Sequence, residues 1–345
     1  MRLPQYDIIT IGTAVQDIFL FLKERDVLVL DNPQGDLTKK KLLALEYGAK
    51  IHAARSAMCF GGGALNSAVT FSRLGLKTAV LAALGCDDNA TAIVNFLKQE
   101  NIDTSFITYH SRCQTGFSVL VVDAGTGEHV ALVERGANNV FSFSARKRGV
   151  ASAPWYYLTS LTGSSWEQVL EKITNTIKRQ KLFWAWNPGN EQLARGWGLF
   201  GRYLKYCTVF ILNRDEALEL LRADSKEEEM SIDQILTALL HWGPKMVIVT
   251  DGQDGAYFAD KRQRYHVAAS SDLEVMESTG AGDAFGSGFV GGLLATKMQN
   301  IPYALQAAMA NAESVISKVG AQAGILDIAA RERAIKKKKY KIKKI

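Results

Sequence analysis

The stretch Glu277-Ser-Thr-Gly-Ala-Gly-Asp-Ala-Phe-Gly-Ser-Gly-Phe-Val-Gly-Gly292 is rich in glycine at the point where an apolar helix is predicted to begin. Glycine destabilises a helix by about 1 kcal/mol per residue relative to alanine. A glycine turn at a helix N-terminus, however, exposes backbone N–H groups and the positive end of the helix dipole. The stretch therefore favours a site for an anion such as phosphate.

A purely structural interpretation of this stretch is also open. Asp283 lies in the predicted first turn, where a carboxylate can simply cap the helix. Gly286, Gly288, Gly291 and Gly292 are typical of a helix that packs closely in the core. The stretch is neither a Walker loop, since Gly-Lys-Ser/Thr occurs nowhere in the chain, nor the dinucleotide fingerprint, since Phe285 replaces its third glycine.

Outside this stretch, short apolar runs alternate with segments of helical length. The predicted strands are YDIITIG, KTAVLAALG, PWYYLTSL, KLFWAWN, CTVFILN and KMVIVTDG, and the predicted helices are ALNSAVTFSRLG, ATAIVNFLKQEN, SWEQVLEKITNTIKRQ and SIDQILTALLHW. This alternation predicts an α/β fold with a mostly parallel sheet covered on both faces. In such sheets ligands bind beyond the carboxyl ends of the strands.

Two segments interrupt the alternation. Residues 17–60 contain a polar, basic insert without a βα unit, and residues 116–134 alternate between apolar and polar and turn at DAGTGE. We expect them to form a small antiparallel sheet that covers the main one as a lid.

Three further positions are candidates for ligand binding. Asp17 follows the first strand, and Asn66 begins a helix after the glycines at 61–63, so both can bind hydroxyl groups. Asn213 and Glu216 are three residues apart at a predicted helix start, which suits a magnesium ion that keeps most of its waters. Each position is equally compatible with an ordinary cap or an exposed turn residue.

The positive charge of the chain is concentrated at its end. The formal net charge is +6, but RERAIKKKKYKIKKI at 331–345 carries +8, so the remaining chain carries −2. We therefore do not expect residues 1–330 to bind nucleic acid. We expect the Lys-rich tail to be a solvated or disordered end.

The cysteines and the apolar runs indicate the cellular compartment in which the protein is expected. Cys59, Cys86, Cys113 and Cys207 are scattered without metal-ligand spacing, which is typical of reduced thiols. The N-terminus has no signal-peptide pattern, and no apolar run reaches the ~20 residues needed to cross a bilayer. The expected location is the cytoplasm, with no membrane partner.

Four motifs together resemble one family. STGAGDAFGSGF and GGGALNSAVTFSRLGL are similar to the two signatures of ribokinase / phosphofructokinase-B-type carbohydrate kinases, NRDE to their N-x-x-E motif and VIVTDGQDGAYF to their T-x-G-x-x-G turn. The resemblance extends from Asp7 to Leu326. It implies a ribokinase-like three-layer α/β/α sandwich over 1–330 with a β lid, followed by the tail at 331–345.

The resemblance also implies roles for individual residues. Asp283 would be the general base, and the anion hole would consist of Gly280, Ala281 and Gly282. The acceptor would be bound by Asp17, Gly62, Asn66 and Arg135, and the nucleotide would be lined by Asn187, Thr250, Gly252, Gly255 and Asn311. Asn213 and Glu216 would organise magnesium through water, and Glu277 would bind a monovalent cation such as potassium. Glu277 departs from the family, which usually has Asp at this position.

The implied activity is ATP-dependent phosphorylation of a primary hydroxyl of a sugar or sugar acid, such as ribose, fructose or 2-keto-3-deoxygluconate. A nucleoside kinase is an alternative if Phe19, Phe117 or Trp155 lines the acceptor pocket. A sugar-phosphate kinase would need several cations there, and only Arg55 and Arg135 are evident. The remaining alternative is a catalytically silent sugar-binding protein, and the lid is the candidate surface for a homodimer.

Overall fold

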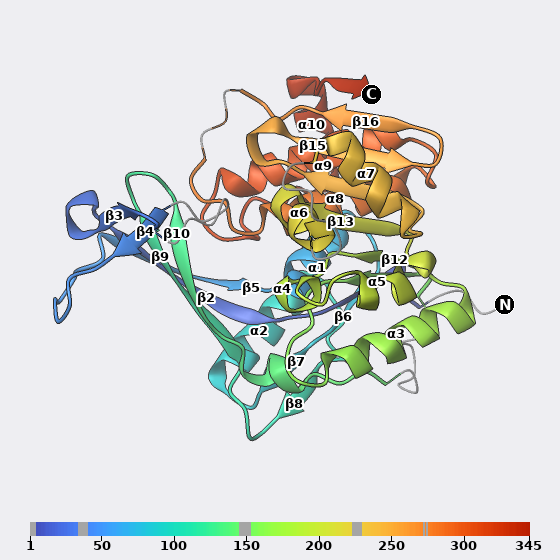
Figure 1. Ribbon diagram of the computed structural model, residues 1–345. Coiled ribbons are helices and arrows are strands. Elements are labelled where there is room, and N and C mark those ends of the chain that lie inside the picture. The colour runs from blue at the N-terminus through green and yellow to red at the C-terminus, as the bar shows by residue number, and fades with distance from the viewer. Residues whose placement is uncertain (1–4, 34–40, 145–152, 223–229, 272, 274) are drawn as a thin grey trace.

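A nine-stranded sheet runs through the centre of the molecule (Figure 1). The structure is a computed structural model that describes residues 5–33, 41–144, 153–222, 230–271, 273 and 275–345. The strands of this sheet, in spatial order, are β17 (Ile342–Lys344), β16 (Arg264–Val267), β15 (Ala256–Asp260), β14 (Met246–Thr250), β13 (Val209–Asn213), β12 (Phe183–Trp186), β11 (Trp155–Leu158), β1 (Ile8–Ile11) and β6 (Thr78–Leu81).

The strands from β14 to β6 are all parallel, whereas β15, β16 and β17 add antiparallel strands at one edge. All six predicted strand segments are present, although KTAVLAALG divides into β6 and β7 (Ala83–Gly85), which pairs with β8 (Thr108–His110). The predicted mostly parallel sheet is confirmed.

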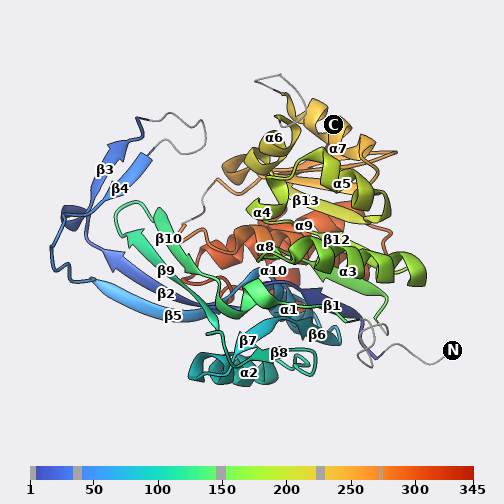
Figure 2. The same ribbon diagram turned by 60° about the horizontal axis from the view of Figure 1, so that its bottom comes forward.

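Helices cover both faces of the sheet, which gives three layers (Figure 2). The helices on one face are α3 (Trp166–Gln180), α4 (Asn190–Leu193), α5 (Trp197–Tyr203), α6 (Arg214–Arg222) and α7 (Ile232–His241), and those on the other are α1 (Gly63–Arg73), α2 (Asp88–Gln99), α8 (Ala281–Ala295), α9 (Ile301–Ile316) and α10 (Ile328–Lys338). Neighbouring strand residues such as Ile8 and Ile9 face opposite layers, so the buried strands are apolar throughout.

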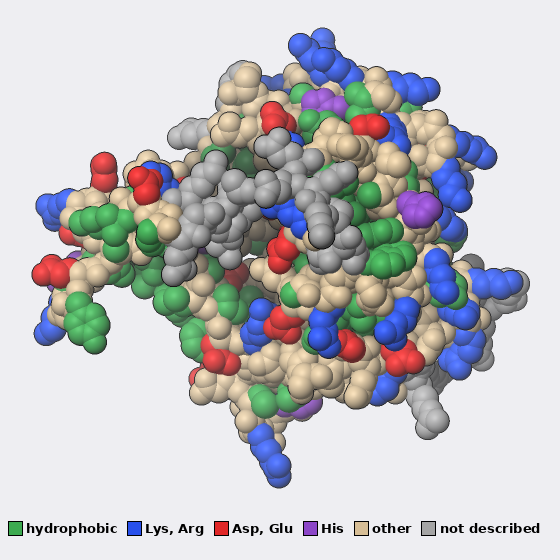
Figure 3. All heavy atoms as spheres, in the orientation of Figure 1, with side chains coloured by type: hydrophobic (Ala, Val, Ile, Leu, Met, Phe, Trp, Pro, Cys, Tyr) green, Lys and Arg blue, Asp and Glu red, His purple; other side chains and the backbone are tan. Residues whose placement is uncertain are grey.

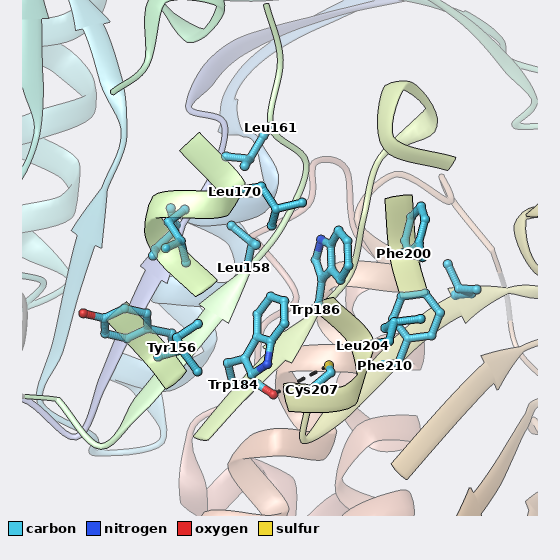
Figure 4. Close-up of a cluster of buried hydrophobic side chains, with 14 of the residues drawn as sticks. Tyr156, Leu158, Leu161, Leu170, Trp184, Trp186, Phe200, Leu204, Cys207 and Phe210 are labelled. Carbon is cyan, nitrogen blue, oxygen red and sulfur yellow. Dashed lines mark hydrogen bonds between the residues drawn. The ribbon is translucent and has the colours of Figure 1, made fainter. Parts of the chain in front are cut away.

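Aromatic side chains fill the layer under α3 and α5. Trp186 lies between Trp184 and Phe200, with ring centroids 5.4 Å and 4.7 Å away (Figure 4). All three side chains are completely buried, so this cluster supplies a large share of the hydrophobic stabilisation that positions the strand ends.

Glycine allows α8 and α9 to pack closely. A Cβ atom on Gly288 would lie 3.0 Å from the Cα atom of Ala308, and one on Gly292 would lie 2.7 Å from the Cα atom of Ala304. These contacts confirm the predicted packing role of the later glycines in the stretch 277–292. They also fix the position of the α8 N-terminus.

The lid is a four-stranded sheet beside the body (Figures 1 and 2). Its strands, in spatial order, are β10 (His129–Glu134), β9 (Gly116–Asp123), β2 (Val15–Leu22) and β5 (Arg55–Gly61), and a separate hairpin of β3 (Leu28–Asp31) and β4 (Lys41–Ala44) extends from it. Residues 34–40 of the predicted segment 17–60 lie outside the described residues.

One feature of the predicted lid was wrong. The lid is mixed, because β2 and β9 pair in parallel, whereas β2–β5 and β10–β9 are antiparallel. β2 and β9 come from distant parts of the chain and run in the same direction along the lid, so no hairpin turn constrains them to be antiparallel.

The prediction of a solvated or disordered tail was also wrong. Residue 330 lies inside α10, and β17 pairs with β16 at the edge of the main sheet. The side chain of Tyr340 is buried, and its hydroxyl donates to Glu313 Oε2 at 2.9 Å. Lysine-rich composition misled the prediction because buried Tyr340, the pairing of β17 and the apolar residues Ile335 and Ile342 hold the segment, while most of its lysines remain exposed.

Glu313 is expected to be the residue on which the C-terminal segment depends most. Its buried carboxylate accepts from Ser270 N at 2.7 Å, from Lys338 Nζ at 2.6 Å and from Tyr340. Glu313→Ala should lower the free energy of unfolding by about 3 kcal/mol in urea titrations, because several charge-assisted bonds lose their acceptor. Exposed Lys344→Ala should change it by less than ~0.5 kcal/mol; equal effects would contradict the anchor.

Candidate active site

The site lies where the first turns of α1 and α8 meet the inner face of the lid. A pocket of about 210 Å³ opens there. Its lining residues are Thr13, Val15, Asp17, Gly62, Asn66, Ser118, Val133, Arg135, Asn138, Thr279, Gly280 and Asp283. The structure thus brings together all four predicted acceptor-binding residues, the predicted base and part of the predicted anion hole.

Asp283 is held by a hydrogen bond from α1. Asn66 Nδ2 donates to Asp283 Oδ2 at 2.9 Å, and Gln322 Nε2 donates to Asn66 Oδ1 at 2.9 Å. Burial raises the pKa of Asp283, and the bond from Asn66 partly opposes that rise. A carboxylate with a raised pKa at the mouth of a pocket is suited to accept a proton from a bound hydroxyl.

Asp17 is the second carboxylate of the pocket. It is 5% exposed and accepts from Ser118 Oγ at 2.5 Å. Burial raises its pKa, the bond from Ser118 opposes this, and the charges of Glu277 and Asp283 raise it further. A Cβ atom on Gly61 would lie 1.9 Å from Asp17 Oδ2, so only glycine fits beside this carboxylate.

The backbone before α8 forms a tight glycine turn, which differs in one respect from the predicted anion hole. Gly280 has a left-handed φ of 79°, and a Cβ atom there would lie 2.4 Å from the Cβ atom of Ala321. Ala281 N–H donates to Ser278 O at 3.2 Å, so it is engaged within the turn. Gly282 and Asp283 are first-turn residues whose N–H groups precede the first intrahelical bond, from Ala284 N to Gly280 O.

Asn213 and Glu216 cap α6 reciprocally. Asn213 N–H donates to Glu216 Oε2 at 2.8 Å, and Glu216 N–H donates to Asn213 Oδ1 at 2.8 Å. Burial raises the pKa of Glu216; the bond from Asn213 opposes this, and Asp283 adds to the rise. Asn213 and Glu216 therefore do cap the helix, and the Glu216 carboxylate lies close enough to Asp283 for its charge to raise the pKa of Glu216.

Neighbouring strand ends carry most of the predicted nucleotide-binding residues. Asn213 and Thr250 are paired at the ends of β13 and β14, and Asn187 Nδ2 donates to Ile211 O at 3.1 Å. Gly252 and Gly255 lie in the turn after β14, and a Cβ atom on Gly255 would lie 2.0 Å from Val267 O. These residues therefore lie at or just after the carboxyl ends of the parallel strands β12, β13 and β14.

Asn311 does not join them. It is buried on α9, where Nδ2 donates to Ala284 O at 2.9 Å and Oδ1 accepts from Leu326 N at 3.0 Å. Its amide is engaged in packing α9 against α8, which explains its position without a nucleotide.

Glu277 is buried in the loop before α8. Its Oε1 accepts from Thr279 N and lies 4.0 Å from His129 Nδ1 on the lid strand β10. Its Oε2 and the Thr279 hydroxyl are buried without a hydrogen-bond partner among the described residues. Two oxygens without partners in one turn are suited to a cation.

Among the described residues that line the pocket, Arg135 is the one cation, and its Nε lies 3.3 Å from Glu191 Oε1. None of these described lining residues is aromatic. Phe19 is buried within the lid, Trp155 lies at the opposite end of its strand, and Phe117 lines a different pocket. The three predicted aromatic candidates therefore do not line this pocket.

Sequence reasoning missed four residues that shape the pocket: Gly61, Ser118, Asn138 and Gln322. Asn138 closes its floor, with Oδ1 accepting from Ala14 N at 2.9 Å and Nδ2 donating to Ala14 O at 3.0 Å. Gly61 belonged to a glycine cluster already noticed in the sequence. Ser118 and Gln322 carry no local signal, because their partners are more than 100 residues away, and Asn138 bonds Ala14 across a similar distance in addition to nearby Arg135 O.

Two absences hold for the part of the chain that the structure describes. There, no cluster of three or more His, Cys, Asp or Glu side chains could hold a metal ion. In the same residues no helix has the length and apolar character needed to cross a membrane.

Comparison with known proteins identifies a family to which the chain is similar. A model of pfkB family carbohydrate kinases matches residues 25–328. The chain is 27% identical over 282 residues to the ribokinase of Staphylococcus aureus, covering 81% of this chain and 89% of that protein.

Solved structures show the same fold. Ribokinase from Giardia lamblia superposes with a TM-score of 0.77 at 18% identity, covering 96% of this chain and 99% of that one. A nucleoside kinase from Methanocaldococcus jannaschii superposes with a TM-score of 0.72 at 18% identity, covering 97% and 99%.

Because burial raises the pKa of Asp283, the folded chain binds this proton more tightly than the unfolded chain does. Ionised Asp283 therefore destabilises the folded state at high pH, and the penalty shrinks as the pH falls from the raised pKa of the folded state to the ordinary aspartate pKa. Asp283→Asn should raise the melting temperature by about 1–3 °C at pH 8, with a smaller difference at pH 4.

Thermal unfolding followed by circular dichroism across pH 4–8 measures this difference. The matched control is exposed Asp88→Asn on α2, which should not raise the melting temperature. An Asp283→Asn protein that is no more stable than the wild type at pH 8 would contradict the buried-charge interpretation.

Proposed function

The chain belongs to the pfkB family of carbohydrate kinases, and on that premise we propose that it transfers the γ-phosphoryl group of ATP to a primary hydroxyl of a sugar or sugar acid. The observation that carries this proposal is the position of Asp283. Its carboxylate lies at once in the first turn of α8, beside the tight glycine turn, and in the small polar pocket that contains Asp17.

In the proposed reaction, Asp283 takes the proton of the acceptor hydroxyl while the hydroxyl oxygen attacks the γ-phosphorus. A bond forms between that oxygen and phosphorus, the bond from phosphorus to the bridging oxygen breaks, and ADP leaves. The N–H groups of Gly280 and Gly282 and the positive end of α8 stabilise charge on the transferred group. Ala281 contributes if its bond to Ser278 O opens.

The pocket supports a sugar or sugar acid as the acceptor. Its buried carboxylate, Asp17, and its amide, Asn66, are suited to pairs of hydroxyl groups. A nucleoside base would need an aromatic or broader apolar wall, and the lining residues supply only Val15 and Val133 as larger apolar groups. A sugar phosphate would need more cations than Arg135.

Nucleotide and magnesium are assigned to the neighbouring strand ends. We place the nucleotide along Thr250, Gly252, Gly255 and Asn187, and magnesium near Asn213 and Glu216. Glu216 uses Oε2 for the α6 cap, so Oε1 is the oxygen that would face a magnesium-bound water. Bound magnesium would neutralise charge on the ATP phosphates.

Glu277 is assigned to a monovalent cation such as potassium. The partnerless oxygens of Glu277 and Thr279 fit such an ion, although Glu277 is one methylene longer than the usual aspartate. His129 Nδ1, 4.0 Å from the same carboxylate, is the group that competes with the ion.

We also propose that two copies associate through the outer face of the lid. Strand pairing places Met58, Ile18, Val119 and Leu132 in one row across the four strands. Met58 is 66% exposed and Leu132 is 60% exposed. Figure 3 shows hydrophobic side chains gathered at the left of the molecule over the β3–β4 hairpin, which extends from the lid. A continuous apolar row across a sheet is typical of a protein interface, and a second copy presents a matching face.

The catalytic proposal is tested by measuring ADP release with ATP, magnesium and a panel of sugars, sugar acids and nucleosides. One sugar or sugar acid should give the highest rate, and Asp283→Asn should lower its kcat by at least ~100-fold with little change in ATP binding. Exposed Asp88→Asn is the control. A higher rate with a nucleoside would show that the acceptor is a nucleoside and not a sugar. Near-normal turnover of Asp283→Asn would show that Asp283 is not the base. If no acceptor stimulated ADP release, a catalytically silent sugar-binding protein would be favoured.

The lid proposal is tested by light scattering after size-exclusion chromatography. The wild-type protein should elute as a dimer at micromolar concentration, and Leu132→Asp with Met58→Asp should yield monomers, because each charge would be buried in the interface. Exposed Val275→Asp, which lies in the loop before α8, is the control. A monomeric wild type would contradict the proposal.

A further inference from the structure

Gln322 lies behind the proposed base and does not line the pocket. It belongs to the turn between α9 and α10, is 6% exposed, and donates from Nε2 to Asn66 Oδ1 at 2.9 Å. Asn66 is 4% exposed and donates from Nδ2 to Asp283 Oδ2 at 2.9 Å. The three side chains form a chain of hydrogen bonds that runs in one direction, from buried Gln322 through buried Asn66 to half-buried Asp283.

The backbone at Gln322 is itself held in place. Arg73 Nη1 donates to Gln322 O at 3.1 Å and to Ile325 O at 2.8 Å. The same guanidinium bonds Glu100 through Nε and Nη2, at 3.0 Å and 2.7 Å. This bidentate pair anchors the turn to α1 and the end of α2, so the Gln322 side chain has little freedom to move away from Asn66.

The orientation of the Asn66 amide matters for the base. An ionised carboxylate only accepts hydrogen bonds, so Asn66 must present its NH₂ group to Asp283. Its carbonyl oxygen then faces Gln322, where only a donor is compatible with it. If residue 322 could not donate, the buried Oδ1 would lose its partner, and rotation of the amide would place an oxygen against the carboxylate.

We propose that Gln322 is a positioning residue for the phosphoryl transfer: it fixes the Asn66 amide so that its NH₂ group stays on Asp283. The inference rests on the proposed role of Asp283 as the base. It adds a residue that has no contact with the acceptor pocket.

Other charged and titratable groups lie near Asp283. The charge of Asp283 raises the pKa of Asp17 on β2, Tyr157 on β11 and Glu216 on α6. Arg135 lines the same pocket, and Glu277 lies buried in the loop before α8. Burial favours protonated Asp283, whereas the bond from Asn66 favours the ionised form. Loss of that bond should therefore keep Asp283 protonated to a higher pH.

Gln322→Met tests this, since it keeps the length of the side chain and removes the donor. With ATP, magnesium and the best acceptor of the panel, the acid limb of the kcat profile should move to higher pH. At pH 6 kcat should fall about tenfold, whereas at pH 9 it should approach the wild-type value with an unchanged KM for ATP. Gln322→Glu, which cannot donate when ionised, should show the same direction and serves if the Met variant does not fold.

Two further variants separate positioning from a general loss of structure. Gln192→Met removes another buried glutamine, which bonds Gly189 N at 2.9 Å, and should leave the acid limb in place. In an Asn66→Ala background the Gln322→Met substitution should change the pH profile no further, because the amide through which it acts is gone. An effect that persists in that background would overturn the proposal.

A measurement without acceptor keeps this inference distinct from the proposed function. Carboxyl ¹³C NMR of the full-length protein follows the titration of Asp283, whose signal is the one absent from Asp283→Asn. Its midpoint should rise in Gln322→Met. An unchanged midpoint would overturn the positioning role even if Asp283 is the base, whereas normal turnover of Asp283→Asn would overturn the base while leaving the hydrogen-bond chain intact.

Discussion

The hydrogen bond from Asn66 to Asp283 joins the first turns of α1 and α8, which are 217 residues apart in the sequence. α1 follows the lid strand β5, and α8 is fixed against α9 by close contacts at Gly288 and Gly292. The bond therefore forms only when the lid, the sheet and this helix layer are all in place. The site depends on the whole fold rather than on one loop.

The same arrangement concentrates acidic groups at one end of the sheet. Burial raises the pKa of Asp17, Glu216 and Asp283, which means that each charge is held at a cost to the folded state. The aromatic layer around Trp184 and Trp186 and the packed α8–α9 pair provide hydrophobic stabilisation that offsets this cost. Acceptor hydroxyls and cations would relieve it, which is consistent with a site that binds polar substrates.

Much of the fold and of the candidate site could be predicted from the sequence because local residue patterns indicate both. Apolar runs predicted the parallel strands, and the glycine motifs placed Asn66 and Asp283 at helix starts. Gln322 and Ser118 could not be predicted as site residues, since their partners come from distant segments of the chain. The C-terminal segment was mispredicted because its composition hides the contact between Tyr340 and Glu313, and the parallel pairing of β2 with β9 left no turn signal.

The central claim, that the pocket at Asp17, Asn66 and Asp283 receives the acceptor, is tested most directly by a crystal structure with the preferred acceptor and a non-hydrolysable ATP analogue. The account predicts one acceptor oxygen within about 3.2 Å of a carboxylate oxygen of Asp283 and further hydroxyl groups on Asp17. An acceptor bound instead in the pocket of about 400 Å³ at Gln16, Gln114 and Phe117, on the opposite face of the lid strands, would contradict it.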